Sequence, residues 1–337
     1  MRLGITGVAG YIGRLFAERV VAAGIAERIV GVDLAPAPFP ASRIQCVRRD
    51  VRDPGLAADL AGCDAVVHFA FVVETMRDRK LMYDVNLNGT RNVLAACERA
   101  GVSTLVVASS VAAYGVQGDR VIDERTPCLG DARSFYAHTK RLVEDELDVF
   151  ATRNPGVRLV RVRPSVVLGP RCNTWALGAM AELGRVDTRR GMRLPLVHED
   201  DVVEAFFRAL VRPVEGPILV AHRRSLAMAD IARRLGRKPL VLPDAWVLRL
   251  GDAAFSAGLT RMSSDWLSLT VGNRFDFDPS ASEAALDWRP AHDPMETLFV
   301  VLANAARLRS RGQRFDARTD RLEGTRYDLP ASPGDHP

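Results

Sequence analysis

Short apolar runs alternate with segments of helical apolar spacing through the first half of the chain. Runs of strand length lie at residues 2–6, 28–32, 44–47, 65–70 and 104–108. The run at 65–70 is continuous rather than alternating, which is typical of a parallel strand covered on both faces. Strands and helices that alternate at this spacing predict an α/β fold built on a doubly wound parallel sheet, with ligands beyond the carboxyl ends of its strands.

The second half shows the same pattern with more interruptions. Strand-like runs recur at 157–162 and 218–221, whereas residues 225–235, 246–255 and 295–308 have helical apolar spacing. We expect residues 1–170, with 196–222 returning to them, to form the first domain. Residues 171–195 and 223–312 are expected to form a smaller mixed substrate-binding lobe, and 313–337, which lack periodicity, a mobile tail.

A glycine-rich turn separates the first strand from the first helix. Gly7, Gly10 and Gly13 are evenly spaced, with Tyr11 and Ile12 between the last two. Glycine allows backbone angles closed to other residues and lets a phosphate approach the chain, while the helix N-terminus offers free amides. A merely tight strand-to-helix turn would also explain a lone glycine pattern. In this context the turn favours a Rossmann-type dinucleotide-binding domain over 1–170.

An acidic residue at the end of the second strand bears on the choice of dinucleotide. Asp33 lies twenty residues beyond Gly13, where a carboxylate accepts hydrogen bonds from the adenosine ribose. The same carboxylate repels a 2′-phosphate, so the sequence favours NAD over NADP. Arg14 or Arg43 would have to host the phosphate if the cofactor were NADP.

Candidate proton chemistry lies at Tyr136 and Lys140. The two residues are four positions apart in a helical segment and therefore share one helix face. An adjacent ammonium favours a phenolate and lowers the pKa of the phenol. The plain alternative is an amphipathic helix in which the tyrosine packs and the lysine is solvated.

Together these and further motifs resemble an extended short-chain dehydrogenase/reductase, within the NAD-dependent epimerase/dehydratase family and on its hydroxysteroid dehydrogenase/reductase-like branch. The resemblance covers about residues 2–290. It rests on Thr6-Gly7-x-x-Gly10-x-x-Gly13, Asp33, Asp50-Val51, His68-x-Ala70, Asn86, Gly89-Thr90, Ser109-Ser110, Tyr114-Gly115, Tyr136-x-x-x-Lys140 and Arg163-Pro164. The ordered set is far more specific than any one of its motifs.

The resemblance implies a catalytic set of Ser110, Tyr136 and Lys140. Ser110 would hold the substrate oxygen, with its neighbour Ser109 as the weaker candidate. Tyr136 would be the acid/base, and Lys140 would lower the pKa of Tyr136 and hold the nicotinamide ribose. Hydride transfer at an alcohol carbon needs a proton moved on the oxygen by a group within hydrogen-bond reach, which agrees with these roles.

The resemblance also implies further cofactor-binding residues. Asp50 and Val51 would meet the adenine, the backbone of Phe69 and Ala70 would line the dinucleotide, and Pro164 would also contact the cofactor. Asn86 would order the site, or would simply cap the helix that follows it. His68 is interpreted as a structural residue at a strand end. With Gly7, Gly10, Tyr11, Ile12, Gly13, Asp33, Tyr136 and Lys140 these residues complete the expected NAD site.

The substrate is less legible. Nucleotide-sugar enzymes of the family commonly carry asparagine where this chain has Val166. Phe71, Val72 and Val73 would make the entrance of the site apolar, or else they simply complete a buried strand. The leading hypothesis is an NAD(P)-dependent oxidoreductase that interconverts a secondary alcohol and a ketone on a small, largely apolar metabolite. One alternative is a nucleotide-sugar epimerase or dehydratase with retained NAD. A second is a non-catalytic dinucleotide sensor, which would have no need of a tuned phenol.

Composition and charge limit the classes of protein and of binding partner that we expect. Apolar residues make up 47% and charged residues 26%, with a net charge of +5, so a mainly disordered or fibrous protein is not expected. The late arginines are interleaved with acids, which argues against a nucleic-acid partner. Five cysteines without C-x-x-C spacing predict reduced thiols and no metal site. Without a legible signal peptide or membrane span we expect a cytoplasmic protein, and the resemblance implies a homodimer through helices near 88–100 and 138–150.

Overall fold

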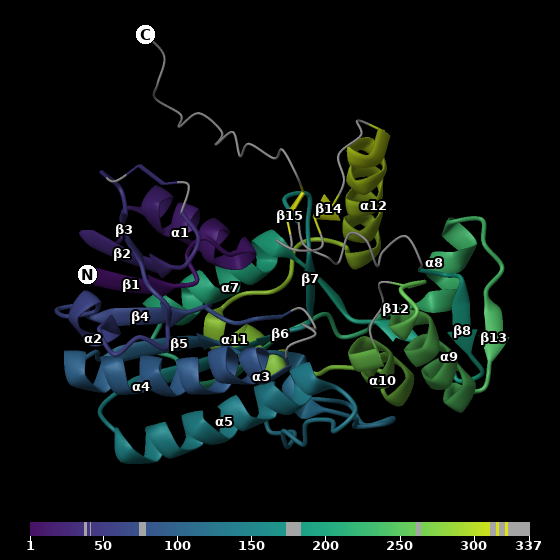
Figure 1. The fold of residues 1–337 in the computed structure, drawn as a ribbon, viewed down its shortest axis with the longest axis horizontal. Helices are drawn as coiled ribbons and strands as arrows, with labels where there is room; N and C mark the ends of the chain where they lie inside the picture. Colours follow the sequence, from purple (N-terminus) through teal and green to yellow (C-terminus); the bar gives the residue numbers. More distant parts are fainter. Residues whose placement is uncertain are drawn as a thin grey trace, which may run out of the picture.

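A seven-stranded parallel sheet forms the centre of the computed structural model, which describes residues 1–36, 39–40, 42–73, 79–172, 183–260, 264–310, 315–316 and 321–322. Figure 1 shows the sheet edge to edge with helices on both faces. The strands lie in the order β11 (Gly216–Val220), β6 (Arg158–Pro164), β5 (Thr104–Ala108), β4 (Ala65–His68), β1 (Arg2–Thr6), β2 (Arg28–Asp33) and β3 (Gln45–Arg48). The doubly wound Rossmann-type sheet expected from the sequence is confirmed.

The direction of winding reverses between β1 and β4. Strands β2 and β3 extend the sheet to one side of β1, while β5, β6 and β11 extend it to the other side of β4. In the register of these two central strands Thr6 lies beside His68. Ligands of open α/β sheets bind outside the carboxyl ends of the strands at such a switch point, so Thr6 and His68 mark the floor of the candidate site.

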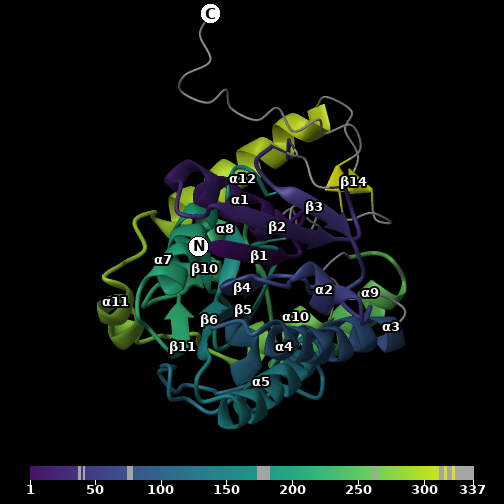
Figure 2. The ribbon, with the colours of Figure 1, turned by 90° about the vertical axis from the view of Figure 1, so that its left-hand side faces the viewer.

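Two helical layers bury the two faces of the sheet, as the turned view in Figure 2 shows. One core joins β1 to α1 (Tyr11–Ala23) and α7 (Glu199–Val211) through Phe16, Val20 and Phe206. The other joins β5 to α4 (Gly89–Ala100) and α5 (Phe135–Arg153) through Val93 and Leu147. Short helices complete the layers: α2 (Leu56–Asp59), α3 (Arg79–Tyr83), the π-helical turn η1 (Asp84–Asn88), the 3₁₀ turn η2 (Val111–Tyr114) and α11 (Ser280–Leu286).

The smaller lobe is assembled from very short strands and four helices in the described part of the chain. Strand β8 (Val186–Thr188) pairs with β13 (Leu240–Leu242), and β9 (Arg193–Leu194) with β12 (Leu226–Ala227). A further pair, β7 (Val166–Leu168) with β10 (Leu196–His198), comes from the ranges expected for the first domain, yet its Leu168 and Leu196 side chains pack in the apolar cluster of the lobe. The helices are α8 (Met228–Arg234), α9 (Asp244–Ser256), α10 (Ser264–Gly272) and α12 (Pro294–Ser310). Their buried residues form a separate apolar cluster that includes Leu194, Ile231 and Leu298.

The expected tail, 313–337, falls mostly outside the described residues. Within it the structure describes two short paired strands, β14 (Phe315–Asp316) and β15 (Arg321–Leu322). Residues 173–182 of the expected substrate lobe also lie outside the description. Among the helices that are described, none has the length and apolarity needed to cross a bilayer.

Candidate active site

The glycine turn packs so closely against neighbouring backbone that Gly7 and Gly13 have no room for a side chain. Gly7 has a φ of 74°, and a Cβ atom there would lie 2.5 Å from the amide nitrogen of Ala70. A Cβ at Gly13 would lie 2.1 Å from the carbonyl oxygen of Gly7. The turn therefore brings the N-terminus of α1, with the backbone of Tyr11 and Ile12 in its first turn, directly against the end of β4. Such an N-terminus offers unpaired amides and a favourable dipole to a pyrophosphate.

Asp33 is held at the rim of this turn. Its carboxylate accepts hydrogen bonds from the backbone amides of Ala9, at 2.9 Å, and Ala35, at 3.0 Å. A carboxylate has about four lone-pair positions, so capacity remains for ribose hydroxyls. The glycine turn and this fixed acid fit the adenosine and pyrophosphate parts of NAD.

Asp50 and Val51 lie beyond β3 and have protein partners of their own. The Asp50 carboxylate binds Arg52 at 2.6 Å, and this hydrogen bond lowers the pKa of Asp50. The Val51 side chain is buried, and its carbonyl oxygen accepts a hydrogen bond from Asn92 at 2.7 Å. An adenine-binding role for the two residues stays a prediction.

Two of the expected cofactor-binding residues, Phe69 and Pro164, lie at the ends of β4 and β6. The Phe69 ring packs between Phe16 and Phe206, with centroid separations of 5.3 and 4.7 Å, which leaves its backbone at the edge of the glycine turn. Pro164 ends β6 beside Val220. Ser165, which the sequence analysis passed over, follows it with a buried hydroxyl that has no hydrogen-bond partner in the described structure.

Helix α5 begins where its capping residue places it. The Ser134 hydroxyl accepts a hydrogen bond from the Ala137 amide at 3.2 Å, so α5 starts at Phe135 and its first two turns contain Tyr136 and Lys140. Ser110, just beyond β5, is hydrogen-bonded to the Tyr136 side chain. The structure thus brings together the three residues that were expected to be catalytic.

Burial dominates the protonation of this pair. Burial raises the pKa of Tyr136 to about 12, and the hydrogen bond with Ser110 opposes the rise. Burial lowers the pKa of Lys140 to about 7, opposed by the negative charge of Glu144. The expected lowering of the phenol pKa by Lys140 is therefore not seen in this structure, in which desolvation outweighs the hydrogen bond with Ser110 and the Lys140 Nζ atom lies 5.8 Å from the centroid of the Tyr136 ring.

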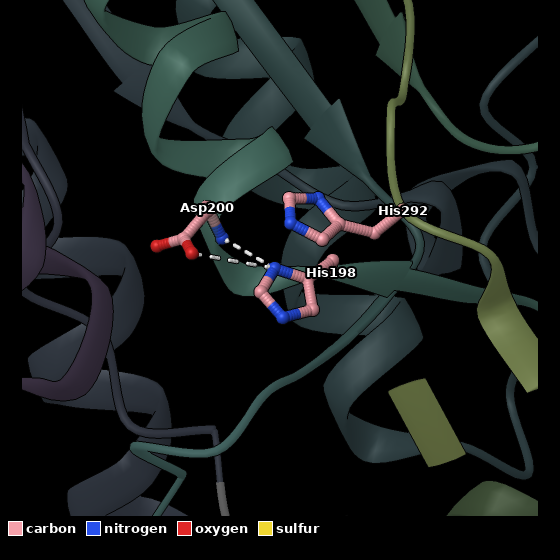
Figure 3. A group of neighbouring side chains, drawn as sticks. All are labelled: His198, Asp200 and His292. Carbon is pink, nitrogen blue, oxygen red and sulfur yellow. Dashed lines mark hydrogen bonds and ion pairs between the residues drawn. The ribbon is translucent and has the colours of Figure 1, made fainter. Parts of the chain in front are cut away.

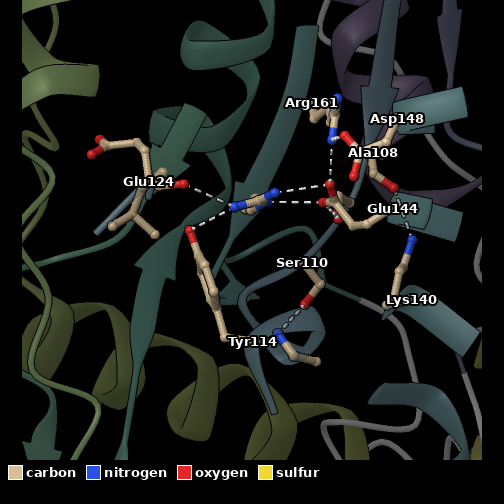
Figure 4. Close-up of polar contacts among 12 residues, drawn as sticks. Ala108, Ser110, Tyr114, Glu124, Lys140, Glu144, Asp148 and Arg161 are labelled. Carbon is tan, nitrogen blue, oxygen red and sulfur yellow. Dashed lines mark hydrogen bonds and ion pairs between the residues drawn. The ribbon is translucent and has the colours of Figure 1, made fainter. Parts of the chain in front are cut away.

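Lys140 has two partners that the sequence did not assign. Its ammonium donates a hydrogen bond to the carbonyl oxygen of Ala108, at the end of β5, over 2.8 Å (Figure 4). The same Nζ atom lies 3.3 Å from the centroid of the Phe71 ring, which is a cation–π geometry.

A buried network of charged residues links α5 to β6. Glu144 binds Arg163 through both carboxylate oxygens at 2.8 Å and accepts a hydrogen bond from Ser109 at 2.5 Å. Figure 4 also shows its contact with Arg161, at 3.3 Å. Burial opposes the charge of Glu144, yet the bonds from Arg163 outweigh it and hold the pKa of the carboxyl below its ordinary value. Ser109 therefore belongs to this network, while Ser110 faces Tyr136.

The Asn86 side chain binds the segment that follows β4 and does not cap a helix. Its amide oxygen accepts a hydrogen bond from the backbone nitrogen of Val72 at 2.7 Å, and its amide nitrogen donates to the carbonyl oxygen of the same residue at 2.9 Å. Helix α4 instead has Asn88 as its N-cap, without a side-chain bond. Asn86 thus fixes the segment that leaves β4.

His68 lies in the floor of the site with both ring nitrogens occupied. Nδ1 is 2.7 Å from the hydroxyl of Thr6, and Nε2 is 3.1 Å from the hydroxyl of Thr90. Burial, with a smaller contribution from Lys140, lowers the pKa of His68 to about 3. The neutral, doubly bonded ring agrees with a structural role at the end of β4.

A second histidine group lies at the N-terminus of α7. His198, Asp200 and His292 have potential metal-ligand atoms within 4.8 Å of one another (Figure 3). The two imidazole rings are stacked, however, with centroids 3.8 Å apart and planes 13° apart, so their in-plane lone pairs run parallel instead of converging. Nδ1 of His198 also accepts a hydrogen bond from the backbone amide of Asp200 at 3.1 Å. We assign no metal to this group.

Tyr11 links the glycine turn to the same helix. Its hydroxyl donates a hydrogen bond to Glu199, which is fully buried and also binds Arg171 at 2.8 Å. Burial raises the pKa of Tyr11 above its ordinary value. The Tyr11 hydroxyl is therefore held by the N-terminus of α7, and its ring packs against the apolar cluster of the smaller lobe.

Residues 3–220 match the profile described as "NAD dependent epimerase/dehydratase family". The chain belongs to this family. The family expected from the motifs is thereby confirmed, and with it NAD as the cofactor for which the family is named.

Several curated members of the family are similar over half of the chain. The 2-alkyl-3-oxoalkanoate reductase of Shewanella oneidensis is 27% identical, over 49% of this chain and 44% of the relative. N-acetyl-alpha-D-glucosaminyl-diphospho-ditrans,octacis-undecaprenol 4-epimerase of Escherichia coli O157:H7 is 35% identical, over 50% of this chain and 49% of the relative. The 3beta-hydroxysteroid-dehydrogenase/decarboxylase isoform 1 of Arabidopsis thaliana is 30% identical, over 49% of this chain and 41% of the relative. Each match spans less than half of the relative's own length.

Several solved structures share the fold over most of the chain. UDP-glucose 4-epimerase of Thermotoga maritima, solved with UDP-glucose, has a TM-score of 0.70 at 19% identity and covers 91% of this chain and 99% of its own. UDP-glucose 4-epimerase of Thermus thermophilus, solved with NAD, has a TM-score of 0.69 at 24% identity with the same coverage. At these identities the likeness concerns the fold alone.

Proposed function

We propose that this family member is an NAD(P)-dependent oxidoreductase that interconverts a secondary alcohol and a ketone on a small, largely apolar metabolite. The observation that carries the proposal is the grouping of Ser110, Tyr136 and Lys140 at the carboxyl end of β5, beside the switch point of the sheet. Bound NAD would supply the hydride acceptor, held by the glycine turn and Asp33.

Each side chain of the set has a defined part in this proposal. Ser110 donates a hydrogen bond to the substrate oxygen. Tyr136, hydrogen-bonded to Ser110, would take the hydroxyl proton during oxidation in its phenolate form, and in its phenol form would donate that proton to the substrate oxygen during reduction. Lys140 stabilises the phenolate and holds the nicotinamide ribose. Since its ammonium has three donors and one binds Ala108, donor capacity remains for that ribose.

The surroundings favour an apolar substrate. The Phe71 ring stands beside Tyr136 with centroids 5.9 Å apart, and Val166 occupies the position at which nucleotide-sugar enzymes of the family commonly have asparagine. The names of two relatives, an oxoalkanoate reductase and a hydroxysteroid dehydrogenase/decarboxylase, point the same way.

The alternative is a nucleotide-sugar epimerase or dehydratase with retained NAD. It is supported by the 35% identical relative, a 4-epimerase of a lipid-linked sugar, and by the epimerase structures that share the fold. A dinucleotide sensor without catalysis is the third possibility, and the Ser110–Tyr136 bond argues against it because a sensor needs no such pair.

Cofactor retention separates the first two functions. We would denature the purified, untreated protein and identify and quantify any nicotinamide nucleotide that it releases. A dehydrogenase uses the nucleotide as a cosubstrate, so we expect little release and reversible binding of added NAD. Near-stoichiometric NAD in the denatured sample would instead support the epimerase or dehydratase.

Location and assembly complete the proposal. We propose a cytoplasmic homodimer that has a small-molecule substrate and binds neither nucleic acid nor membrane. Residues 1–170 with 196–222 would bind the dinucleotide, and 171–195 with 223–312 would bind the substrate. Strand β11, from the returning segment, does lie at the edge of the central sheet beside β6, which supports this division.

A further inference from the structure

One aromatic ring contacts both Tyr136 and Lys140. The Lys140 Nζ atom lies 3.3 Å from the centroid of the Phe71 ring. The rings of Phe71 and Tyr136 are nearly perpendicular, at 87°, with centroids 5.9 Å apart. Phe71 follows β4, whereas the other two residues belong to α5, so this contact joins two segments that are distant in the sequence.

The backbone that carries Phe71 is fixed on both sides. Before it, the backbone of Phe69 and Ala70 packs against Gly7. After it, the amide and carbonyl groups of Val72 are both hydrogen-bonded to the buried Asn86 side chain. The Phe71 ring is therefore presented to α5 by a rigid frame, which is what a group that positions others requires.

We propose that Phe71 is a positioning residue of the active site, whose ring holds the Lys140 ammonium in place beside Tyr136. The proposal rests on the proposed function for its catalytic meaning, but the contact itself does not. Neither Phe71 nor its contact follows from the motif Tyr136-x-x-x-Lys140, since the ring comes from a different part of the chain.

The charge of Lys140 depends on every group that faces it. Burial favours the neutral amine, whereas Glu144 favours the ammonium. The Ala108 carbonyl and the Phe71 ring face also favour the ammonium, because both present negative charge to it. Among the described residues, His68 and Tyr136 are also titratable neighbours: burial lowers the pKa of His68 to about 3 and raises that of Tyr136 to about 12, so both favour their neutral forms near pH 7. Loss of the ring face would therefore shift Lys140 toward the neutral form.

The chain allows a direct measurement of this shift, because it contains only three lysines, Lys80, Lys140 and Lys238. Protein labelled with ¹³C at lysine Cε would be titrated by NMR without cofactor or substrate, and Lys140→Met would assign the Lys140 signal. We expect Phe71→Leu to lower the Lys140 titration midpoint by about one pH unit, from cation–π strength at a desolvated site. Phe71→Tyr, which keeps a ring face, should restore it, and Phe71→Met serves if the leucine variant does not fold.

A second cation–π pair provides the matched control. The Arg19 guanidinium lies 3.8 Å from the centroid of the Phe207 ring, on the opposite helical layer. Phe207→Leu removes an aromatic ring of the same kind but should leave the Lys140 midpoint unchanged. If Phe71→Leu and Phe71→Met left the midpoint in place, or if Phe207→Leu moved it equally, the proposal would be overturned.

The outcome is separable from that of the proposed function. A shifted Lys140 midpoint in a protein that oxidises no alcohol would uphold the Phe71 contact and reject the dehydrogenase. If the protein is a dehydrogenase, Phe71→Leu should also move the upper limb of its pH–rate profile to lower pH, because turnover needs the ammonium. An unmoved pH–rate profile would reject the positioning role even if the NMR midpoint shifted.

Discussion

The Tyr136 phenol is further from ionisation in this structure than a free tyrosine. Burial raises its pKa to about 12, while Lys140, buried beside it, has a pKa of about 7. A tyrosine and lysine spaced four apart predict a shared helix face, and the structure confirms that placement. The sequence could not show how strongly both groups would be desolvated, because the covering groups, Phe71 above all, come from a segment some 65 residues earlier in the printed chain.

His68 offers a test of burial through pH. Its pKa of about 3 lies below the ordinary value of 6.5, so between these pH values the unfolded chain binds more protons than the folded one. The free energy of unfolding should fall on acidification from 6.5 toward 3, by up to about 1.4 kcal/mol per pH unit. In chemical denaturation experiments, the free energy of unfolding of His68→Gln should change less with pH between 6.5 and 3 than that of the parent protein.

The control for that experiment is His138→Gln, on the partly exposed side of α5. This variant should retain the pH dependence of the parent protein. Equal slopes for the parent and His68→Gln would mean that His68 is not the buried neutral group described above.

At the scale of elements, the central strands and the glycine turn were predictable and the supporting contacts were not. Apolar runs located β1, β2, β4 and β5 to within about two residues, since strands covered on both faces leave a continuous apolar pattern. The lobe pairings were missed, because strands such as β9 and β12 have only two residues each and show no periodicity. The bond of Glu144 to Arg163 was also missed, since it depends on how α5 packs against β6.

Two glutamates of α5 test the weight of that buried network. Glu144 is bonded twice to Arg163, with side-chain exposures of 3% and 6% for the pair. Removing one charge leaves the other buried and unpaired, so Glu144→Gln should lower the free energy of unfolding by about 3–5 kcal/mol. Glu146 instead pairs with Arg91 on the surface, and Glu146→Gln should cost about 0–1 kcal/mol. Similar losses in urea denaturation would show that the network adds no special stability.

At the scale of the whole molecule, the two layers and the switch point place the site, whereas the assembly stays a prediction. The proposed homodimer would use α4 and α5, which are already tied by Arg91 and Glu146. On these two helices Val149 is the single large apolar side chain that is markedly exposed, so the contact would be largely polar. Light scattering at micromolar concentration should give twice the chain mass of 36.9 kDa. A measured mass equal to that of one chain would contradict the proposed homodimer.

The measurement that tests the central claim most directly is the formation of NADH from NAD across a panel of apolar secondary alcohols, with the parent protein, Tyr136→Phe and Tyr83→Phe. We expect the parent to reduce NAD with at least one alcohol. Tyr136→Phe should bind NAD within a few-fold of the parent yet turn over on the order of 10²–10⁴ times more slowly, since it lacks the acid/base. Tyr83→Phe, on the partly exposed α3, should match the parent. Undiminished turnover in Tyr136→Phe would contradict the assignment of Tyr136 and with it the proposed chemistry.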